Sequence, residues 1–416
     1  MVVGSGGREH ALSWKLSQSS KVDKVFTAPG NGGTDNNVAI SVDDIDGLAN
    51  FAAKNNCFTV VGPEAPLAQG IVDKFNEKNL KVFGPTKNAA QLESSKIWAK
   101  NFMKRNQIPT AEFEIFDDPN KASEYVDTLS YDVVVKADGL AAGKGVIVCA
   151  NKDEAKAAIE TILVKKTFGD AGNQIIIEER IDGIEASYIA LCDGNIAVPM
   201  ASSQDHKRIF DDDKGPNTGG MGAYSPTPVI NEELAQKIQK EIIEKTVVCM
   251  KKEGISFQGF LYAGIMIKDG QPFVLEYNVR MGDPECQPIM MRVDFDLYDY
   301  FTASAEGALD SMPSLEWKKQ TAVCVVMASQ GYPESYPKNE EIQGFENIPN
   351  NSFVFHAGTK KENDKILSNG GRVLGVTALG DSLESAIANA YAATDKISWP
   401  HKYLRKDIGK KGLNYL

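Results

Sequence analysis

The 416-residue sequence predicts a multidomain protein that combines α/β and α+β folds, because three of its features point the same way. The chain is longer than one typical domain and is long enough for two to four domains with a sizeable core. Over the first hundred residues, short apolar runs alternate with helical patterns, which is typical of a parallel sheet covered by helices. Later in the chain, apolar runs follow one another across short glycine-containing loops, which indicates antiparallel hairpins.

The composition is that of an ordinary globular protein and argues against several kinds of function. Hydrophobic residues make up 42% of the chain and charged residues 24%. No stretch approaches the roughly 18 apolar residues of a membrane span, and the N-terminus lacks the apolar core of a secretion signal. The net charge of −11 argues against general binding to nucleic acid or anionic membranes. Six cysteines without C-x-x-C spacing predict a reduced, cytoplasmic protein without structural zinc.

The N-terminus carries a glycine cluster between a short predicted strand and a predicted helix at residues 11–17. The segment Gly4-Ser-Gly-Gly-Arg-Glu-His10 allows backbone N–H groups to approach an anion at the start of that helix. A dinucleotide-binding loop requires the pattern G-x-G-x-x-G, but Glu9 occupies its last position. We therefore predict that a single phosphate binds here in preference to NAD.

Three further strands are predicted in this region, at Val22–Thr27, Phe58–Val61 and Lys81–Gly84. Each of them ends in a loop rich in glycine, proline or polar residues. Ligands bind at the carboxyl ends of the strands in doubly wound parallel sheets. These features predict a Rossmann-like N-terminal domain at residues 1–98, with a ligand at that edge of its sheet.

A second domain follows a helix predicted at Asn88–Arg105, and its first feature is a glycine-rich hairpin. Predicted strands at 131–136 and 146–150 flank the loop. A Walker A loop is excluded, because three residues instead of four separate its glycines and Gly145 replaces the hydroxyl residue. The hairpin instead suits a lid that folds over phosphates with Lys144 at its tip. Lys136 is costly to bury unpaired in an apolar strand, so we predict a phosphate partner for it.

Two polar segments come next. A strand from Asn173 leads into Glu179–Ile181, whose backbone suits an adenine edge, and Glu185 suits ribose hydroxyls. The connection at 202–224 is too long and glycine-rich for a simple connector, and such loops usually carry function. Within it, Asp205 suits an ammonium group, and the N–H groups of Gly219-Gly220 suit a carboxylate. The acidic run at 211–213 is interpreted as a solvated turn, and 232–252 as an amphipathic helix.

The segment Val274-Leu-Glu-Tyr-Asn-Val-Arg-Met-Gly-Asp-Pro-Glu285 begins as a strand. Alternate strand residues point to one face, so Glu276, Asn278 and Arg280 are expected to project together. Two oxygen donors suit a hard cation and a guanidinium suits phosphoryl charge, which together predict a magnesium-bound polyphosphate. The strand at 257–267 is expected to pair with this one through a tight turn. It contains no carboxylate, so the number of metal ions stays open.

Five segments together carry a resemblance to a known family. They are Gly4–His10, Lys136–Gly145, Gln204–Arg208, Gly215–Tyr224 and Arg280–Glu285. In combination they resemble the phosphoribosylamine–glycine ligases of the ATP-grasp superfamily, over essentially the whole chain. The resemblance implies an ATP-grasp domain at 99–320 with a small lid subdomain at about 118–182. It also implies a small C-terminal α/β domain at 321–416.

The resemblance implies that ATP phosphorylates glycine and that 5-phosphoribosylamine then attacks the acyl phosphate, in a cytoplasmic monomer. Its implied ATP contacts are Lys96, Lys136, Gly143, Lys144, Gly145, Glu178, Glu179, Arg180, Ile181 and Glu185. Glu276 and Asn278 would hold Mg²⁺ or Mn²⁺, and Arg280 and Lys144 would act on the transferring phosphoryl group. The implied contacts of the two substrates are Gly6, Gly7, Asn31, Glu64, Asp205, Gly219, Gly220, Asp283, Pro284 and Glu285.

Other classes of function remain open at this stage. The opening glycines alone suggest an NAD-dependent oxidoreductase, and a lid over ATP also suits a non-catalytic nucleotide sensor. Within the superfamily, a carboxylase acting on another purine intermediate is the nearest alternative. No catalytic cluster is expected in 321–416, and the basic tail at 402–411 is interpreted as solvated surface.

Overall fold

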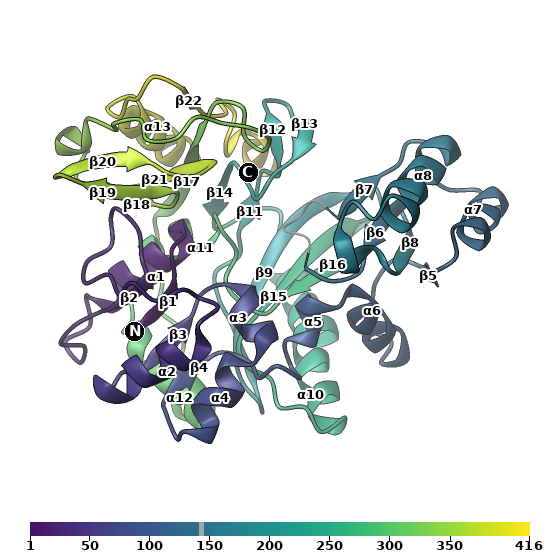
Figure 1. Cartoon of the computed structure of the whole chain (residues 1–416), viewed down its shortest axis with the longest axis horizontal. Helices are drawn as coiled ribbons and strands as arrows, with labels where there is room; N and C mark the ends of the chain where they lie inside the picture. The colour runs from purple at the N-terminus through teal and green to yellow at the C-terminus, as the bar shows by residue number, and fades with distance from the viewer. Residues whose placement is uncertain (141–144) are drawn as a thin grey trace.

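The computed structural model describes residues 1–140 and 145–416, and it confirms the predicted mixture of α/β and α+β domains (Figure 1). The N-terminal domain contains one parallel sheet in the order β2-β1-β3-β4. Its strands are β1 (Val2–Gly4), β2 (Thr27–Pro29), β3 (Thr59–Val61) and β4 (Val82–Phe83). Its helices are α1 (Gly7–Leu16), α2 (Ile45–Lys54), α3 (Glu64–Gln69) and α4 (Ile71–Glu77).

Strand β2 begins at Thr27, whereas the sequence predicted a strand at Val22–Thr27. The neighbouring strand β1 is only three residues long, so it pairs with Thr27, Ala28 and Pro29, and its Val2 N–H also donates to the Phe26 carbonyl oxygen at 2.8 Å. The early residues of the predicted strand therefore have no ladder partner in β1.

The helix predicted at Asn88–Arg105 is divided into α5 (Gln91–Ser94) and α6 (Lys96–Arg105). Ser95 between them has an extended backbone, with φ −135° and ψ 109°. Its hydroxyl accepts a hydrogen bond from the Trp98 N–H at 3.1 Å, which makes it the N-cap of α6. The break places residues from two separate helices beside the same cavity, described below.

The predicted hairpin and lid subdomain form an antiparallel sheet in the order β5-β8-β6-β7, which projects to the right in Figure 1. The strands are β5 (Phe113–Phe116), β6 (Val133–Ala137), β7 (Val146–Val148) and β8 (Ile175–Glu179). Helices α7 (Pro119–Thr128) and α8 (Lys152–Ile159) cover it, followed by a π-helical turn at Glu160–Val164 and a 3-10 turn at Gly169–Gly172. In the hairpin, Lys136 of β6 pairs with Val146 of β7. The predicted tip residues Gly143 and Lys144 lie outside the described residues.

The central sheet is antiparallel in the order β10-β9-β15-β16. It consists of β9 (Ile184–Asp193), β10 (Ala197–Pro199), β15 (Gln258–Lys268) and β16 (Gln271–Asn278). The predicted pairing of the last two strands is confirmed, since Gly264 pairs with Glu276 and Tyr262 with Asn278. The predicted long helix is continuous in sequence as α9 (Glu232–Ile238), a π-helical segment (Gln239–Glu244) and α10 (Lys245–Lys252). Two more helices follow the sheet, α11 (Cys286–Arg292) and α12 (Leu297–Glu306), and then a 3-10 turn at Leu309–Ser311.

The C-terminal sheet, at the top of Figure 1, has the order β11-β14-β17-β21-β18, with β22 beside β17. Its late strands are β17 (Thr321–Ser329), β18 (Ser352–His356), β21 (Arg372–Gly380) and β22 (Lys402–Tyr403), packed against α13 (Leu383–Thr394). The short hairpins are β12 (Arg208–Phe210) with β13 (Lys214–Asn217) and β19 (Thr359–Glu362) with β20 (Lys365–Ser368). Two 3-10 turns, Phe345–Asn347 and Lys410–Tyr415, complete the domain.

Two strands of this C-terminal sheet come from the glycine-rich connection that the sequence marked as a loop. They are β11 (Gln204–Asp205) and β14 (Gly222–Ser225), and β14 pairs with β17 along four residues. The connection is therefore held between the central domain and the C-terminal domain. Residues of the C-terminal domain therefore lie close to any ligand that binds to the connection at 202–224.

The basic tail is not simply a solvated surface, as the sequence suggested. Arg405 is only 1% exposed and lies 2.8 Å from Asp213 and 2.7 Å from Asp407. The acidic run does form a turn between β12 and β13, as predicted, but Asp213 in that turn is the tail's ion-pair partner. A buried guanidinium requires such partners, so the tail and the turn fix each other.

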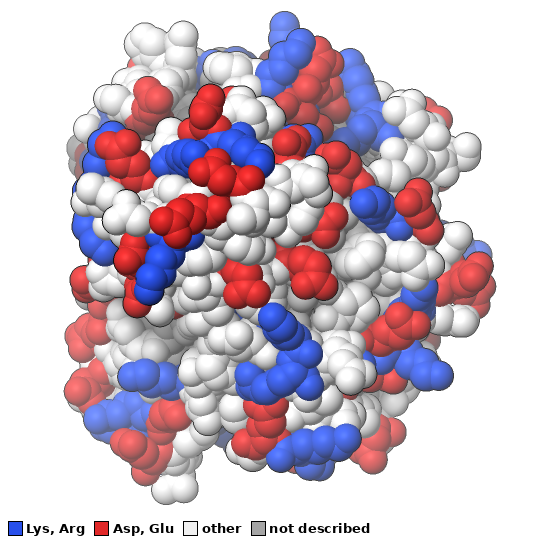
Figure 2. Space-filling view, turned by 90° about the vertical axis from the view of Figure 1, so that its right-hand side faces the viewer, with Lys and Arg blue, Asp and Glu red and all other residues white. Residues whose placement is uncertain are grey.

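The N-terminal domain and the central domain pack together through two hydrophobic clusters. Phe83 of β4 stacks on Phe301 of α12 at 4.2 Å between ring centroids and meets Phe260 of β15 edge-on at 5.0 Å. On the face shown in Figure 2, basic and acidic side chains are interspersed. None of the described helices is long and apolar enough to cross a membrane.

Candidate active site

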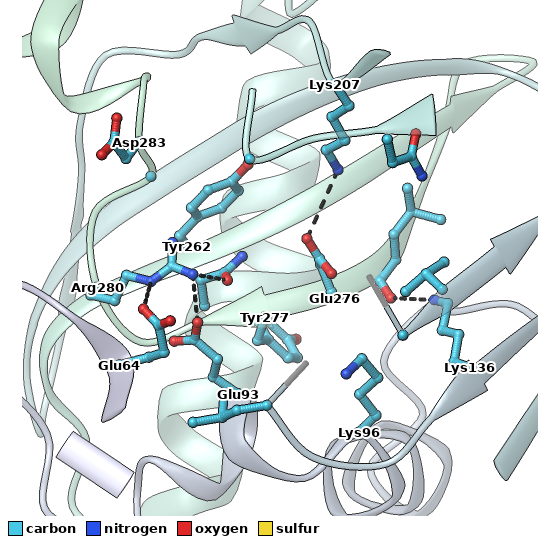
Figure 3. A pocket seen from close by; sticks show the side chains of 18 of the residues that line it. Glu64, Glu93, Lys96, Lys136, Lys207, Tyr262, Glu276, Tyr277, Arg280 and Asp283 are labelled. Atoms are coloured by element: carbon cyan, nitrogen blue, oxygen red, sulfur yellow. Dashed lines mark hydrogen bonds and ion pairs between the residues drawn. The ribbon is translucent and has the colours of Figure 1, made fainter. Parts of the chain in front are cut away.

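A cavity of about 520 Å³ lies where the N-terminal, central and C-terminal domains and the lid hairpin meet. Figure 3 shows its lining from close by, with Lys96, Lys136, Lys207, Glu276 and Arg280 around one space. Of the residues expected to bind ligands, the following line it: Glu64, Lys96, Lys136, Gly145, Glu178, Asp205, Gly219, Glu276, Asn278, Arg280, Asp283 and Glu285. Segments far apart in the sequence therefore converge on one site.

Glu276 on β16 lies among cations. Lys207 approaches its carboxylate to 3.9 Å and also pairs with Glu185, and Lys96 donates to the Gly139 carbonyl oxygen at 2.8 Å. Burial raises the pKa of Glu276, but the charges of Lys207, Lys136, Lys96 and Arg280 outweigh burial and hold it below its usual value. Glu276 is therefore a carboxylate, available to a cation, in surroundings that also attract phosphate. Lys207 was not identified from the sequence, although it lies two residues after Asp205.

The Glu178 side chain is buried between two lysines. Its carboxylate lies 2.8 Å from the Lys100 Nζ and 2.7 Å from the Lys136 Nζ, and only 2% of the residue is exposed. Burial lowers the pKa of Lys100 to about 8, and Glu178 opposes that shift. Lys100 was missed in the sequence. Its signal was its spacing, since residues four apart on a helix, such as Lys96 and Lys100, share a face.

The segment expected to read adenine is only partly free to do so. The Glu179 N–H donates to the Glu112 carbonyl oxygen and the Arg180 N–H to that of Asp132, both at 2.9 Å. The Arg180 side chain pairs with Asp132 and Asp182. Two of the expected backbone donors are therefore used by Glu112 and Asp132, which leaves Ile181 as the expected donor in this segment.

Arg280 lies two residues beyond the end of β16, so the strand face expected to carry it ends at Asn278. Its Nη2 lies 2.6 Å from the Glu93 carboxylate and 2.8 Å from the Asn278 Oδ1, and its Nε lies 3.3 Å from Glu64. Glu93 also accepts the Val279 N–H at 2.8 Å, so it holds both the arginine side chain and the backbone of the preceding residue. Burial raises the pKa of Glu93 above its usual value, and the opposing charge of Arg280 is too weak to cancel this shift. Glu93, like Lys207 and Lys100, was missed in the sequence.

Asp205 is a buried carboxylate that faces the cavity. It is 9% exposed, and no described residue donates a hydrogen bond to its carboxylate. Burial raises its pKa to about 7, against the opposing charge of Lys207. Nearby, Glu285 accepts hydrogen bonds from the Tyr262 hydroxyl at 2.7 Å and from the Ser187 hydroxyl at 3.1 Å. Asp205 is thus the acid best placed to receive a cationic ligand, and Glu285 is already satisfied by hydroxyls.

The glycine loop before α1 faces carboxylates where the sequence suggested a phosphate. The Gly6 N–H donates to Glu9 at 2.6 Å, and a Cβ on Gly6 would lie 3.2 Å from the Asp283 carboxylate. Asp283 keeps a pKa below its usual value because Arg372 and Arg8 outweigh the effect of burial. These carboxylates are offset by Arg8, which lies 2.6 Å from Glu9, and by Arg372 beside Asp283, and the predicted phosphate site stays a prediction.

Several expected contacts lie outside the lining of the cavity. Asn31 donates to the carbonyl oxygens of Ser5 at 2.9 Å and His356 at 2.7 Å, so its amide joins loops of two domains. Pro284 packs against Gly220, whose Cβ would lie 2.5 Å from it. The others outside the lining are Gly6, Gly7, Glu179, Arg180, Ile181, Glu185 and Gly220.

The described residues offer only two of the oxygen ligands that a metal ion would need. In residues 1–140 and 145–416, no three His, Cys, Asp or Glu side chains are grouped to hold a metal. Glu276 and Asn278 offer two oxygen ligands on the cavity wall, and β15 beside them offers no acid. Mg²⁺ commonly binds through one or two carboxylates together with substrate phosphates and water, so this pair fits a nucleotide-bound ion.

Comparison with known proteins decides the family. Three phosphoribosylglycinamide synthetase models match the chain: the N domain at residues 1–93, the ATP-grasp (A) domain at 94–286 and the C domain at 322–411. A phosphoribosylamine–glycine ligase of Neisseria meningitidis serogroup B is 52% identical over 420 residues, covering 100% of this chain and 99% of the relative. The chain belongs to the phosphoribosylglycinamide synthetase family.

Solved structures agree with this family assignment. The crystal structure of a phosphoribosylamine–glycine ligase from Thermotoga maritima is 34% identical, with a TM-score of 0.86, and the match covers 98% of this chain and 99% of that one. The biotin carboxylase domain of a Hydrogenobacter thermophilus 2-oxoglutarate carboxylase, solved with MgADP and bicarbonate, is 15% identical with a TM-score of 0.74. That match covers 97% of this chain and 91% of the domain, and it shows the shared fold alone.

The expected family and fold are therefore confirmed. Phosphoribosylglycinamide synthetases catalyse the ATP-dependent ligation of glycine in purine biosynthesis, so the chain belongs to a family of ligases. This assignment rules out the NAD-dependent oxidoreductase that the opening glycines suggested. The cavity described above lies within the parts of the chain that the three family models match.

Proposed function

We propose that this chain joins glycine to 5-phosphoribosylamine in the cytoplasm, with ATP and Mg²⁺ or Mn²⁺, and releases glycinamide ribonucleotide, ADP and phosphate. The observation that carries the proposal is the convergence, on one cavity, of a carboxylate among four cations and of an unpaired buried acid. The first group suits a polyphosphate with its metal ion. The second, Asp205, suits the ammonium group of glycine.

The lysines position ATP. Lys96 and Lys136 line the cavity from α6 and β6, and Lys207 faces them across Glu276 (Figure 3). We assign the three ammonium groups to the phosphates of ATP and the Ile181 backbone to its adenine. Gly143, Lys144 and Gly145 are proposed to close over the phosphates, and Glu185 is proposed to bind the ribose. Charge stabilisation and positioning supply most of the catalysis in phosphoryl transfer.

In the first step, a carboxylate oxygen of glycine attacks the γ-phosphorus of ATP, the bond to the bridging oxygen breaks, and ADP leaves. Arg280 is proposed to stabilise the charge of the transferring phosphoryl group. Glu276 and Asn278 would hold the metal ion, which neutralises phosphate charge when bound. In this structure Arg280 donates to the Asn278 Oδ1. The amide oxygen has two lone pairs, so Asn278 can accept this hydrogen bond and still offer a lone pair to the ion.

In the second step, the amine of 5-phosphoribosylamine attacks the carbonyl carbon of glycyl phosphate, the C–O bond to phosphate breaks, and the nitrogen loses a proton. Asp205 is proposed to hold the glycine ammonium, which keeps that nitrogen protonated and prevents it from acting as a nucleophile. Asp283, Glu285 and Glu64 are proposed to frame the amine substrate. Gly219 and Gly220 are proposed to present backbone groups to glycine.

An assay of ADP release tests the proposed function. The purified protein should release ADP from MgATP in proportion to product only when glycine and 5-phosphoribosylamine are both present. Alanine and acetate serve as controls, because alanine adds a methyl group and acetate lacks the ammonium that Asp205 would bind. Equal ADP release with acetate, or release that does not depend on glycine, would exclude the proposal.

Replacing Glu276 by Gln should raise the magnesium concentration needed for half-maximal activity by roughly tenfold or more. The amide keeps the shape of the side chain but removes the charge that attracts the ion. The matched control is Glu185→Gln, which changes the other carboxylate beside Lys207. That variant should alter the KM for ATP and leave the magnesium requirement near the wild-type value. An unchanged requirement in Glu276→Gln would show that Glu276 is no metal ligand.

A further inference from the structure

Arg372, the first residue of β21, reaches from the C-terminal domain into the cavity. Its Nη1 donates to the carbonyl oxygens of Gly219 at 2.7 Å, Gly220 at 3.3 Å and Asp283 at 2.6 Å. Its Nη2 lies 3.4 Å from the Asp283 carboxylate. One guanidinium therefore joins the glycine-rich connection to the turn at 282–285, although the three segments are far apart in the sequence.

The packing around these contacts is close. A Cβ on Gly219 would lie 3.0 Å from the Arg372 Cζ, and a Cβ on Gly220, whose φ is +111°, would lie 2.5 Å from Pro284. The Gly219 N–H also donates to the hydroxyl of Tyr332, a second C-terminal residue, at 3.0 Å. Larger residues at 219 and 220 would force the two segments apart. The two glycines thus allow the connection and the turn at 282–285 to approach closely, and the hydrogen bonds of Arg372 stabilise that approach.

The contacts of Arg372 indicate that it holds two loops of the protein together and does not bind a ligand. Asp283 is its one carboxylate partner in the described ion pairs, and the other contacts are neutral carbonyl oxygens on two different loops. A guanidinium presents several donors in a fixed plane, whereas the lysine ammonium is a single flexible point. The geometry is suited to setting the distance between two loops.

We propose that Arg372 is a positioning residue of the ligation reaction, which sets the segment assigned to glycine against the turn assigned to the amine substrate. The inference rests on the proposed function, since it assigns one substrate to each side of the contact. The C-terminal domain then has a part in catalysis, because it fixes how closely the acyl phosphate and the amine meet. A misplacement of about 1 Å can lower a rate roughly 10²-fold.

Loss of the Arg372 contacts should have a chemical consequence that a general loss of stability would not have. When the amine is misplaced, water attacks the carbonyl carbon of glycyl phosphate, the C–O bond to phosphate breaks, and glycine is regenerated. ATP is then consumed without product. The ratio of ADP released to glycinamide ribonucleotide formed, which is one in the coupled reaction, rises above one.

The test compares Arg372→Gln and Arg372→Lys with the wild-type chain, and measures ADP and glycinamide ribonucleotide in the same samples. In Arg372→Gln, product formation should fall about 10²-fold, the ADP-to-product ratio should rise several-fold, and the KM for ATP should stay near wild type. In Arg372→Lys, product formation and the ADP-to-product ratio should both lie between those of the wild type and those of Arg372→Gln. Arg405→Gln is the matched control, because Arg405 is the other arginine of this domain, is buried and does not line the cavity. It should lower the melting temperature and keep the ratio at one.

Each outcome decides a different question. A ratio of one in both Arg372 variants, with or without lower turnover, overturns the positioning role. Failure of the wild-type chain to form product overturns the proposed function and not this inference alone. If Arg372→Gln does not fold, Tyr332→Phe replaces it, since it removes only the hydroxyl that accepts the Gly219 N–H. That variant should raise the ratio by a smaller factor, and an unchanged ratio there also counts against the inference.

Discussion

Replacing Arg280 by alanine should lower turnover by about 10² or more, on the scale of losing one donor that stabilises transition-state charge. Arg280 lines the cavity beside Glu276 and Asn278, where the phosphoryl group is proposed to transfer. Because this charge acts mainly in the transition state, the affinity for ATP should change far less than turnover. Steady-state kinetics and direct ATP titration of the same variant check the two parts separately.

Two variants control for indirect effects of losing Arg280. Arg280→Lys keeps one positive charge beside Glu93 and Glu64, and it should recover part of the lost turnover. Glu93→Gln keeps the arginine but removes the charge that lies 2.6 Å from it, and it should lower turnover less than Arg280→Ala does. Turnover in Arg280→Ala within a few-fold of wild type would exclude the proposed role.

Glu178→Gln should destabilise the protein by about 3–5 kcal/mol, the usual cost of breaking a buried ion pair on one side. The change leaves Lys100 and Lys136 facing each other without the carboxylate that lies 2.8 and 2.7 Å from them. Urea unfolding measures the loss. The matched control is Glu253→Gln, which removes an exposed carboxylate from Arg105 and should cost about 1 kcal/mol or less.

The deficit of Glu178→Gln should also depend on pH. The pKa of Lys100 is about 8 in the folded wild-type chain, below its usual value, and without Glu178 it should fall further. Between that lower pKa and about 8, the unfolded variant binds more protons than the folded one, so its stability rises with pH. The stability of the wild type rises less over this range, because its Lys100 stays largely protonated below pH 8. The difference in stability between wild type and variant should therefore shrink between pH 6 and 8. A deficit that grows with pH would contradict the assigned ion pairs.

Local patterns in the sequence were enough to place part of the site. Glu276 and Asn278, on alternate strand positions, line the cavity as strand periodicity predicted. The burial cost of Lys136 indicated an anionic partner, but its partner in the structure is Glu178 at 2.7 Å, and the phosphate contact stays a prediction. Arg280 also lines the cavity, although the strand ends at Asn278, because the chain beyond the strand turns along the same wall. Lys96 was placed by the family resemblance.

The rest of the site depends on contacts that no local pattern encodes. Glu93 acts through Arg280, which is 187 positions away in the chain, and Arg372 acts through Gly219 and Asp283. A lone charged residue on a helix or strand end usually faces solvent, so neither residue attracts notice in sequence. The same limit applies to β11 and β14, which become strands only because β17 pairs with β14.

The measurement that tests the central claim most directly is the transfer of oxygen from glycine to phosphate. Glycine labelled with ¹⁸O in its carboxylate is turned over with unlabelled MgATP and 5-phosphoribosylamine, and the released phosphate is analysed by mass spectrometry. Activation of glycine as an acyl phosphate in this cavity predicts one ¹⁸O atom in each phosphate released. Phosphate that carries no label, while product still forms, would contradict the account.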